Sequence, residues 1–185
     1  TIIRGDFTLG EEVEICEKKL AKKTGAKYVI GVNSGTDAIF LSLKSLNIGY
    51  GDEIITVSHT AVATLSAIER VGACPVLVDI DPDYFSLDSF HLQEALTSNT
   101  KAIVLVHLYG QAGNLLAIEE FCKKNDLHLI EDVAQAHGAL YKGKRLGSFG
   151  KVGCFSCYPT KNLGAIGDGG LITTDDETLY NEMLK

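Results

Sequence analysis

Short β-rich runs alternate with longer helical stretches along this chain, and that alternation limits its fold more than any other feature. Strand-like apolar runs occupy 28–33, 53–57, 74–80, 101–107, 127–132, 153–158 and 170–174. Apolar residues at helical spacing mark 37–46, 62–71, 87–96 and 115–125 between them. Strands that alternate with helices are joined by right-handed crossovers. The sequence therefore predicts an α/β fold, with a mainly parallel seven-stranded sheet and helices on both faces.

Length and composition predict one globular domain over residues 1–185. A chain of 185 residues, with 45% hydrophobic and 22% charged residues, buries one substantial core. The net charge of −7 argues against nucleic acid as a partner, because a phosphate backbone binds a basic surface. No apolar run reaches the length of a membrane span, so no membrane association is expected.

The cysteines indicate a reducing compartment. There are five, an odd number, mostly in apolar segments: Cys16, Cys74, Cys122, Cys154 and Cys157. Cys154 and Cys157 have C-x-x-C spacing, but no second ligand pair accompanies them. Residues three apart on a strand also face opposite sides of a sheet. We expect reduced core thiols, no metal site and a cytoplasmic protein.

Ligands in such sheets bind beyond the carboxyl ends of the strands, and the first candidate segment lies there. Ser34, Gly35 and Thr36 follow a predicted strand and begin a helix. The free N–H groups at a helix start, with two hydroxyls beside them, would form a phosphate cradle; an ordinary helix cap explains the same residues equally well. The chain contains neither G-x-G-x-x-G after this strand nor G-x-x-x-x-G-K-[ST], so the common nucleotide-binding folds are disfavoured.

Two further strand ends carry reactive groups. The run 127–132 brings Asp132 to its carboxyl end, with Gln135 and His137 following; in the simpler alternative, Asp132 caps a turn and the other two lie on the surface. Lys161 lies with Ser156 in a glycine-rich loop between two apolar runs. A partly buried lysine amine is suited to Schiff-base chemistry. A phosphate cradle, an acid and an amine are the groups that pyridoxal 5'-phosphate (PLP) requires.

A family resemblance rests on four segments in a consistent order: SGTDA, VHLYGQ, IEDVAQAHGA and FSCYPTKNLGAIGDGG. The chain resembles the DegT/DnrJ/EryC1/StrS family of PLP-dependent nucleotide-sugar aminotransferases over essentially its whole length, from RGDFTLGEEVE to the last predicted strand. The resemblance implies the large domain of a fold type I (aspartate aminotransferase-like) PLP-dependent transferase. It also implies a C-terminal small domain outside this sequence, so we expect the chain to be a fragment.

The resemblance assigns roles to individual residues. Lys161 would bind the cofactor covalently and carry a proton between substrate and cofactor; dehydratase relatives have histidine there, so transamination is favoured. Asp132 would pair with the pyridine nitrogen, and Gln135 would lie against the ring or its 3-oxygen. The phosphate would be bound by Ser34, Gly35, Thr36 and Ser156.

The activity implied is transfer of an amino group from an amino acid, glutamate, to a keto group of a nucleotide-linked deoxysugar in amino-sugar or polysaccharide biosynthesis. The motifs resemble members that act on 3-keto sugars more than those that act on 4-keto sugars. The family also implies a homodimer with shared active sites. A non-catalytic regulatory or scaffolding protein of the same fold, and a PLP-dependent sugar dehydratase, are the alternatives.

Several residues near these motifs have two interpretations. Ala61 occupies a position where the family places an aromatic residue against the cofactor ring; His59 would replace that aromatic residue, or serve as a core or turn residue. His107 and Tyr109 either line a sugar pocket or pack and cap a turn, and Tyr158 is a further candidate for substrate contact. Residues 142–145 predict a hairpin turn, with a nucleotide contact as the alternative.

Overall fold

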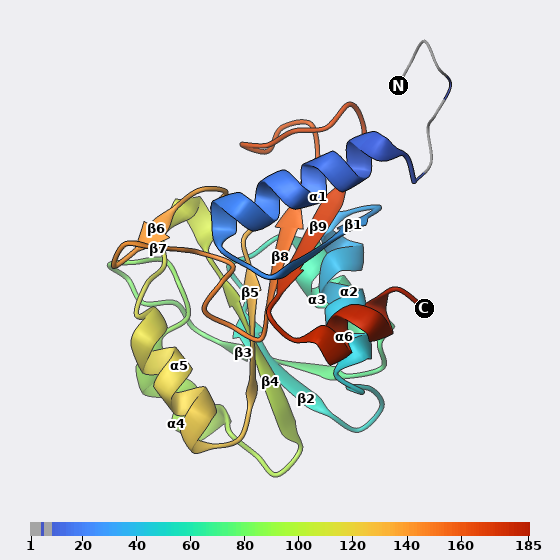
Figure 1. Cartoon of the computed structure of the whole chain (residues 1–185). Helices are drawn as coiled ribbons and strands as arrows, with labels where there is room; N and C mark the ends of the chain where they lie inside the picture. Colours follow the sequence, from blue (N-terminus) through green and yellow to red (C-terminus); the bar gives the residue numbers. More distant parts are fainter. Residues whose placement is uncertain (1–4, 6–8) are drawn as a thin grey trace.

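A computed structural model describes residue 5 and residues 9–185; residues 1–4 and 6–8, which include part of the RGDFTLG segment, lie outside the described residues. All seven predicted strands are present and form one sheet (Figure 1). In spatial order they are β1 (Tyr28–Val32), β9 (Gly170–Thr174), β8 (Val152–Ser156), β5 (His128–Asp132), β4 (Thr100–Val106), β2 (Glu53–Val57) and β3 (Cys74–Val78).

The sheet is mainly parallel, as predicted, with one reversed strand. Neighbouring strands from β8 to β3 all pair in parallel, whereas β9 runs antiparallel to both β1 and β8. The reversal brings the first residue of β9, Gly170, opposite Val32 and Ser156, the last residues of its two neighbours. A side chain at Gly170 would lie 2.3 Å from the Ser34 carbonyl oxygen, so this close approach of chains requires glycine.

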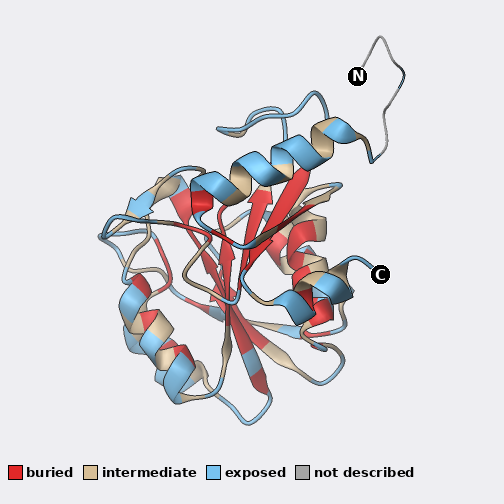
Figure 2. Ribbon diagram, in the orientation of Figure 1, coloured by how far each residue is buried: buried red, intermediate tan, exposed pale blue. Residues whose placement is uncertain are grey.

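Helices cover both faces of the sheet. The helices are α1 (Glu11–Thr24), α2 (Gly35–Ser45), α3 (Val62–Arg70), α4 (Leu92–Ala95), α5 (Leu115–Lys124) and α6 (Glu177–Met183), with short 3-10 turns η1 (Ser89–His91) and η2 (Leu108–Gly110). Residues of α1, α4 and α5 pack in one core, which includes Ile103 and Leu105 of β4. Residues of α2, α3 and α6 pack in a second core, with Ala102 and Val104 from the opposite face of the same strand (Figure 2).

The predicted helix over 87–96 is confirmed in part: residues 89–95 are helical, as a 3-10 turn followed by α4, whereas Leu87 and Asp88 are not. Leu87 forms an isolated antiparallel bridge with Ile80, and the Asp88 N–H donates to the Asp79 carbonyl, so this backbone has a strand-like partner. Asp88 then accepts from the Phe90 N–H and starts a 3-10 turn that leads into the four residues of α4. Helix α6 was not predicted, although Asp176 caps it with two backbone hydrogen bonds.

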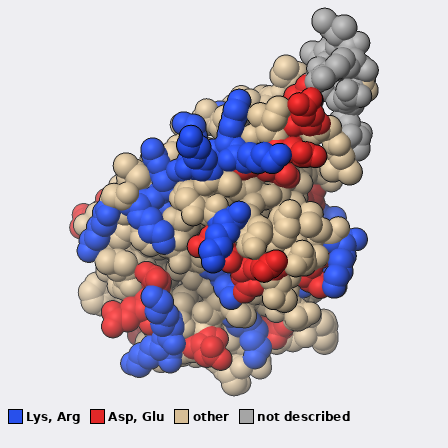
Figure 3. Space-filling view, in the orientation of Figure 1, with Lys and Arg blue, Asp and Glu red and all other residues tan. Residues whose placement is uncertain are grey.

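Two basic segments lie on the surface, and the predicted hairpin is confirmed in one of them. Helix α1 exposes Lys18, Lys19, Lys22 and Lys23, and basic residues gather over α1 in Figure 3. Residues 142–145 turn a hairpin between β6 (Leu140–Tyr141) and β7 (Lys144–Arg145). Its two central residues, Lys142 and Gly143, both have positive φ, at 48° and 82°, as tight two-residue hairpin turns require. In the described part of the chain, no helix is long and apolar enough to span a membrane.

Candidate active site

A cavity of about 240 Å³ opens at the carboxyl edge of the sheet, between the ends of β1, β5 and β8. Six of the seven predicted site residues line it: Ser34, Gly35, Thr36, Asp132, Ser156 and Lys161. Thr64, Tyr158 and Asp168 also line it. Segments that lie far apart in the sequence thus meet at one position, because parallel strands deliver their carboxyl ends to the same edge.

The start of α2 forms one wall of this cavity. The Ser34 hydroxyl accepts from the Asp37 N–H at 3.0 Å, so Ser34 is a helix cap as well as a lining residue. Gly35 approaches β8 so closely that an added Cβ would lie 2.6 Å from the Ser156 Cβ. The first N–H groups of a helix have no acceptor within the helix, and here they face a cavity that also receives the Ser156 side chain. This wall is suited to bind an anionic group.

Asp132 presents a buried carboxylate to the same cavity. Its side chain accepts from the Thr64 hydroxyl at 2.9 Å and from the Ala134 N–H at 3.1 Å, so it both caps the next turn and lines the cavity. Burial raises its pKa, against the lowering effect of these two donors and of the charges of His107 and Lys161. A cationic nitrogen in the cavity would find here the carboxylate that it needs as a partner.

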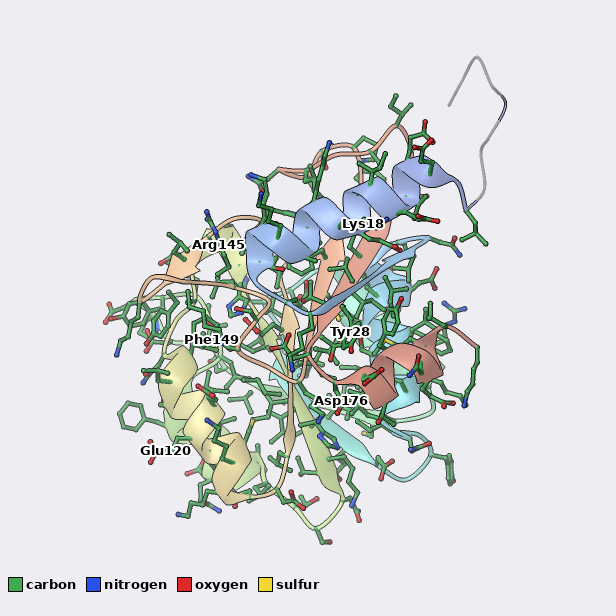
Figure 4. All side chains as sticks on the ribbon, in the orientation of Figure 1. Lys18, Tyr28, Glu120, Arg145, Phe149 and Asp176 are labelled. Atoms are coloured by element: carbon green, nitrogen blue, oxygen red, sulfur yellow. The ribbon has the colours of Figure 1, made fainter. Side chains whose placement is uncertain are left out.

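Glu131, the preceding residue, points to the opposite face of the sheet. His107 bonds to one of its oxygens at 2.9 Å, and the Gly147, Phe149 and Gly150 N–H groups donate to the carboxylate at 2.7–2.8 Å. Burial alone would raise the pKa of Glu131, but His107 and these backbone donors hold it below its usual range. Glu131 therefore anchors the loop that carries Phe149, which Figure 4 labels near Arg145 of the hairpin.

His107 packs in this network and does not line the cavity. Its side chain is fully buried and bonded to Glu131, which favours the packing interpretation. Nδ1 of His107 has no hydrogen-bond partner among the residues that the structure describes. His137 also differs from the surface alternative, because both of its ring nitrogens are buried and its ring lies 5.6 Å from that of Phe155. Burial, followed by the charge of Lys161, lowers the pKa of His137.

Lys161 reaches the cavity from a folded loop between β8 and β9. Its N–H donates to the Tyr158 carbonyl at 2.8 Å, which makes a tight turn at the lysine. The Cys157 N–H bonds to Gly169 and the Ala165 N–H bonds to Cys157, so the two ends of the loop are joined. The half-buried Lys161 side chain therefore lines the same cavity as Asp132, although no direct bond joins them among the described contacts.

The remaining predicted residues lie beside the cavity. Ala61 lines it, whereas His59 does not: the His59 imidazole bonds to the Tyr109 hydroxyl at 3.2 Å, which leaves the ring-stacking interpretation of His59 without support. Gln135 is exposed, and its Oε1 accepts from the Tyr109 N–H at 3.3 Å. Because Gln135 does not line the cavity, its contact with a cofactor ring remains a prediction.

Sequence reasoning missed Thr64 and Asp168 as lining residues. Thr64 lies four residues after Thr60, and their hydroxyls are 2.9 Å apart. The signal in the sequence was therefore a pair of threonines at helical spacing at the start of α3. Asp168 lies in the GDGG segment that follows the lysine loop. Its only signal in the sequence was a carboxylate next to the glycines before the last strand.

The expectation of core thiols is confirmed for Cys122, Cys154 and Cys157, which are buried, and is wrong for Cys16 and Cys74, which are exposed. All five are free thiols, and burial raises the pKa of Cys122 to about 12 and raises that of Cys154 further. Across residue 5 and residues 9–185, no group of His, Cys, Asp or Glu side chains has the arrangement to hold a metal ion. The amine of Lys161, the carboxylate of Asp132 and the start of α2 are charged and donor groups that line the cavity together.

Comparison with known proteins finds close relatives of about twice this length. A dTDP-3-amino-3,6-dideoxy-alpha-D-galactopyranose transaminase from Aneurinibacillus thermoaerophilus is 51% identical over 179 residues, which cover 97% of this chain and 49% of that protein. A pleiotropic regulatory protein from Geobacillus stearothermophilus is 47% identical over 173 residues, covering 94% and 46%. The chain thus spans about half the length of the curated relatives that it matches.

The fold is equally close to solved structures. The crystal structure of S. venezuelae DesV superimposes with a TM-score of 0.94 at 43% identity, covering 98% of this chain and 49% of that one. The α/β architecture and the mainly parallel seven-stranded sheet are those of fold type I PLP-dependent aminotransferases, which confirms the predicted fold class. The model of one family matches all of residues 1–185, so the chain belongs to the DegT/DnrJ/EryC1/StrS aminotransferase family.

Proposed function

We propose that the protein containing this chain is a PLP-dependent aminotransferase that moves an amino group from an amino acid, glutamate, to a keto group of a nucleotide-linked deoxysugar. One observation carries the proposal. The amine of Lys161, the buried carboxylate of Asp132 and the anion-binding start of α2 line one cavity although they come from three separate segments. Family membership and the transaminase name of a relative at 51% identity support it.

The donor set of the cavity fits PLP group by group. The start of α2 at Gly35 and Thr36, with the Ser156 hydroxyl, would bind the phosphate. Asp132 would hold the protonated pyridine nitrogen, and the amine of Lys161 would bond to the aldehyde carbon. When bound, PLP supplies an electron sink for the negative charge that develops on the substrate carbon.

Asp132 has the surroundings that its role requires. Because burial disfavours its charged form, a cation in the cavity is the most effective way to keep the carboxylate ionised. The Thr64 and Ala134 donors fix the orientation of the carboxylate, and each uses a different oxygen, so both oxygens keep acceptor capacity for a group in the cavity. The carboxylate would thus hold the proton on the ring nitrogen.

Lys161 would be the proton carrier once a substrate amine replaces it on the cofactor. The turn at Tyr158 and the joined ends of its loop hold the amine within reach of the cavity. Ala61 lines the cavity where an aromatic ring was expected, so the cofactor face on that side would be held by contacts smaller than ring stacking.

The acceptor is proposed to be a 3-keto sugar. The name of the A. thermoaerophilus relative describes a 3-amino sugar, in agreement with the motif resemblance to members acting at that position. We further propose a cytoplasmic homodimer with shared active sites, in which residues 1–185 form the large domain and a second half of the chain completes the site. Amino-sugar formation for a surface polysaccharide or a glycosylated metabolite is the proposed pathway.

The test is covalent trapping in the full-length protein. Borohydride reduction followed by peptide mapping should place the cofactor on Lys161, and added glutamate should shift the visible absorbance of the unreduced protein. Lys161→Ala should abolish both, whereas Lys142→Ala, at the exposed hairpin turn, should change neither. A labelled peptide elsewhere would overturn the assignment of the lysine.

A non-catalytic regulatory function is the second candidate. It is favoured by one observation, the name of the G. stearothermophilus relative at 47% identity. A regulatory protein would keep the bound cofactor and yet show no glutamate-dependent shift in absorbance. A sugar dehydratase would instead release a deoxysugar without a new amino group, which product analysis with a panel of nucleotide-linked ketosugars distinguishes.

A further inference from the structure

Three aromatic residues form an exposed cluster beside the cavity: His59, Phe85 and Tyr109, here called the aromatic rim. We infer that the aromatic rim binds the hexose ring of the acceptor substrate, with Tyr109 as its central residue; this inference rests on the proposed function. The three residues come from the loops that follow β2, β3 and β4, so they share the carboxyl edge of the sheet with the cavity.

Tyr109 is held from three sides. Its hydroxyl lies 3.2 Å from Nε2 of His59, and its ring meets that of Phe85 edge-on at a centroid distance of 6.0 Å. Its backbone N–H donates to Gln135 at 3.3 Å. A tyrosine with these contacts has a defined orientation, although 62% of its surface remains accessible. Such an exposed and immobilised ring can bind a ligand with little loss of side-chain entropy.

The backbone of the aromatic rim is strained in a way that packing does not explain. Tyr109 and Phe85 have φ angles of +56° and +54°, a region that bulky residues rarely adopt. Phe85 is itself 42% exposed, so the strain at these two positions does not bury their rings. Strained non-glycine residues concentrate at ligand sites, where the fold holds a side chain in a required position.

The aromatic rim continues the wall of the cavity. His59 lies two residues before Ala61, which lines the cavity, and Gln135 lies three residues after Asp132, which also lines it. A sugar whose keto carbon reaches the amine of Lys161 would therefore extend over the neighbouring strand ends, toward β4 and β2. This is the direction in which Tyr109 lies.

The chemistry of the aromatic rim fits a hexose better than a charged group. One face of a pyranose presents C–H groups that pack on an aromatic face, and deoxygenated positions make that face more apolar. The Tyr109 hydroxyl and the His59 imidazole add one polar pair at the edge, which would bond to a sugar hydroxyl. No lysine or arginine contacts these rings in the described part of the chain, so a diphosphate is not the group bound here.

Binding titrations on the full-length, cofactor-loaded protein test the inference without turnover. The ligands are dTDP-glucose against dTDP alone, and UDP-glucose against UDP alone. Tyr109→Ala should weaken binding of the sugar-linked member of a pair about tenfold, and Phe85→Leu about threefold, with binding of the free nucleotide changed less than about twofold. Tyr50→Ala, at a 99% exposed tyrosine on the opposite edge of the sheet, is the matched control and should leave both unchanged.

Each other result overturns the inference. An equal loss for the sugar-linked and the free nucleotide would show that Tyr109 stacks on the base, and no loss for either would remove it from the substrate site. The glutamate-dependent absorbance change of the wild-type protein is measured on the same preparation. A wild-type protein without that change refutes the proposed function, while the titrations still decide the role of Tyr109.

Discussion

Two adjacent carboxylates at the end of β5, on opposite faces of the sheet, differ in how many hydrogen-bond donors surround them. Glu131 faces the α5 side, where His107 and three backbone N–H groups surround it. Asp132 faces the α3 side, where, among the residues that the structure describes, Thr64 and Ala134 donate to it and a cavity lies beside it. The pKa of Glu131 is lowered and that of Asp132 is raised.

The number of donors to a buried carboxylate therefore indicates whether it stabilises the fold or is available to bind a ligand. A carboxylate with a full set of donors stabilises the loops that supply them, and it has no remaining capacity for a ligand. A carboxylate with too few donors is costly in the empty fold and favourable once a cation arrives. Four predictions test this contrast, in order of decreasing effect.

Replacing Asp132 by Asn should abolish the activity while the fold remains intact. Asparagine keeps one acceptor oxygen for the Ala134 N–H, and its NH2 group can donate to the Thr64 hydroxyl, which also accepts. It cannot hold a proton on the ring nitrogen, so kcat should fall by about a thousandfold or more. The melting temperature of the cofactor-free protein should not decrease. Rates and thermal unfolding measured on the same preparation check this; an active Asp132→Asn protein would contradict the assigned role.

Glu131→Gln should have the converse effect: it should lower the stability of the fold and leave kcat nearly unchanged. The amide nitrogen would face the Gly147 N–H or His107 in place of an oxygen, which leaves buried donors unpaired. The cost should be about 2–3 kcal/mol in the free energy of unfolding. Urea denaturation measures it, and kcat of the remaining folded protein should stay within a few-fold of wild type. A stable but inactive variant would place Glu131 in the catalytic site.

Thr64→Val should weaken cofactor binding about five- to tenfold, because it removes one of the two donors that orient Asp132. Thr56→Val is the matched control: Thr56 is also buried and donates to a backbone carbonyl, that of Val104, away from the cavity. Both variants should lose about 1 kcal/mol of stability. Equilibrium titration with PLP distinguishes them, and equal affinities would remove Thr64 from the site.

The pH dependence of stability should have opposite signs for the two carboxylates in cofactor-free protein. Glu131, with a lowered folded pKa, contributes stability that is present above its unfolded pKa and is lost as pH falls through the folded value. Asp132, with a raised folded pKa, imposes a cost that is complete above that value and disappears as pH falls toward its unfolded pKa. Acidification should therefore destabilise Asp132→Asn more steeply than wild type, and Glu131→Gln less steeply. Urea unfolding between about pH 3 and 7 measures these slopes, and parallel curves would refute the contrast.

Much of this architecture followed from the sequence because the signals are local. Five of the seven strands, β2, β4, β5, β8 and β9, are runs of mostly buried residues, and helices at 35–45, 62–70 and 115–124 have apolar residues at helical spacing. The segment 87–96 is helical only over 89–95, as a 3-10 turn followed by α4, because Leu87 and Asp88 pair with Ile80 and Asp79 across a turn. Pairing of this kind is not visible in a periodicity.

The candidate site divides in the same way. Lys161, Asp132 and the Ser34–Thr36 turn were recognisable as residue types at the ends of predicted strands, and the structure brings them to one cavity. The sequence did not show that Glu131 is surrounded by donors while Asp132 lines the cavity. It also did not show that His107 is buried or that Thr64 bonds to Asp132. These features depend on which face of the sheet each residue occupies and which loop reaches it.

The sequence by itself determined the elements, their order and the kinds of reactive group at the strand ends, because these follow from local periodicity and side-chain chemistry. Only the tertiary structure decided which carboxylate is satisfied and which is left for a ligand, and how Tyr109 and Phe85 come to be held at the surface. The physical reason is that hydrogen-bond partners and solvent access are set by segments distant in the chain, and these two quantities control the ionisation of a buried acid.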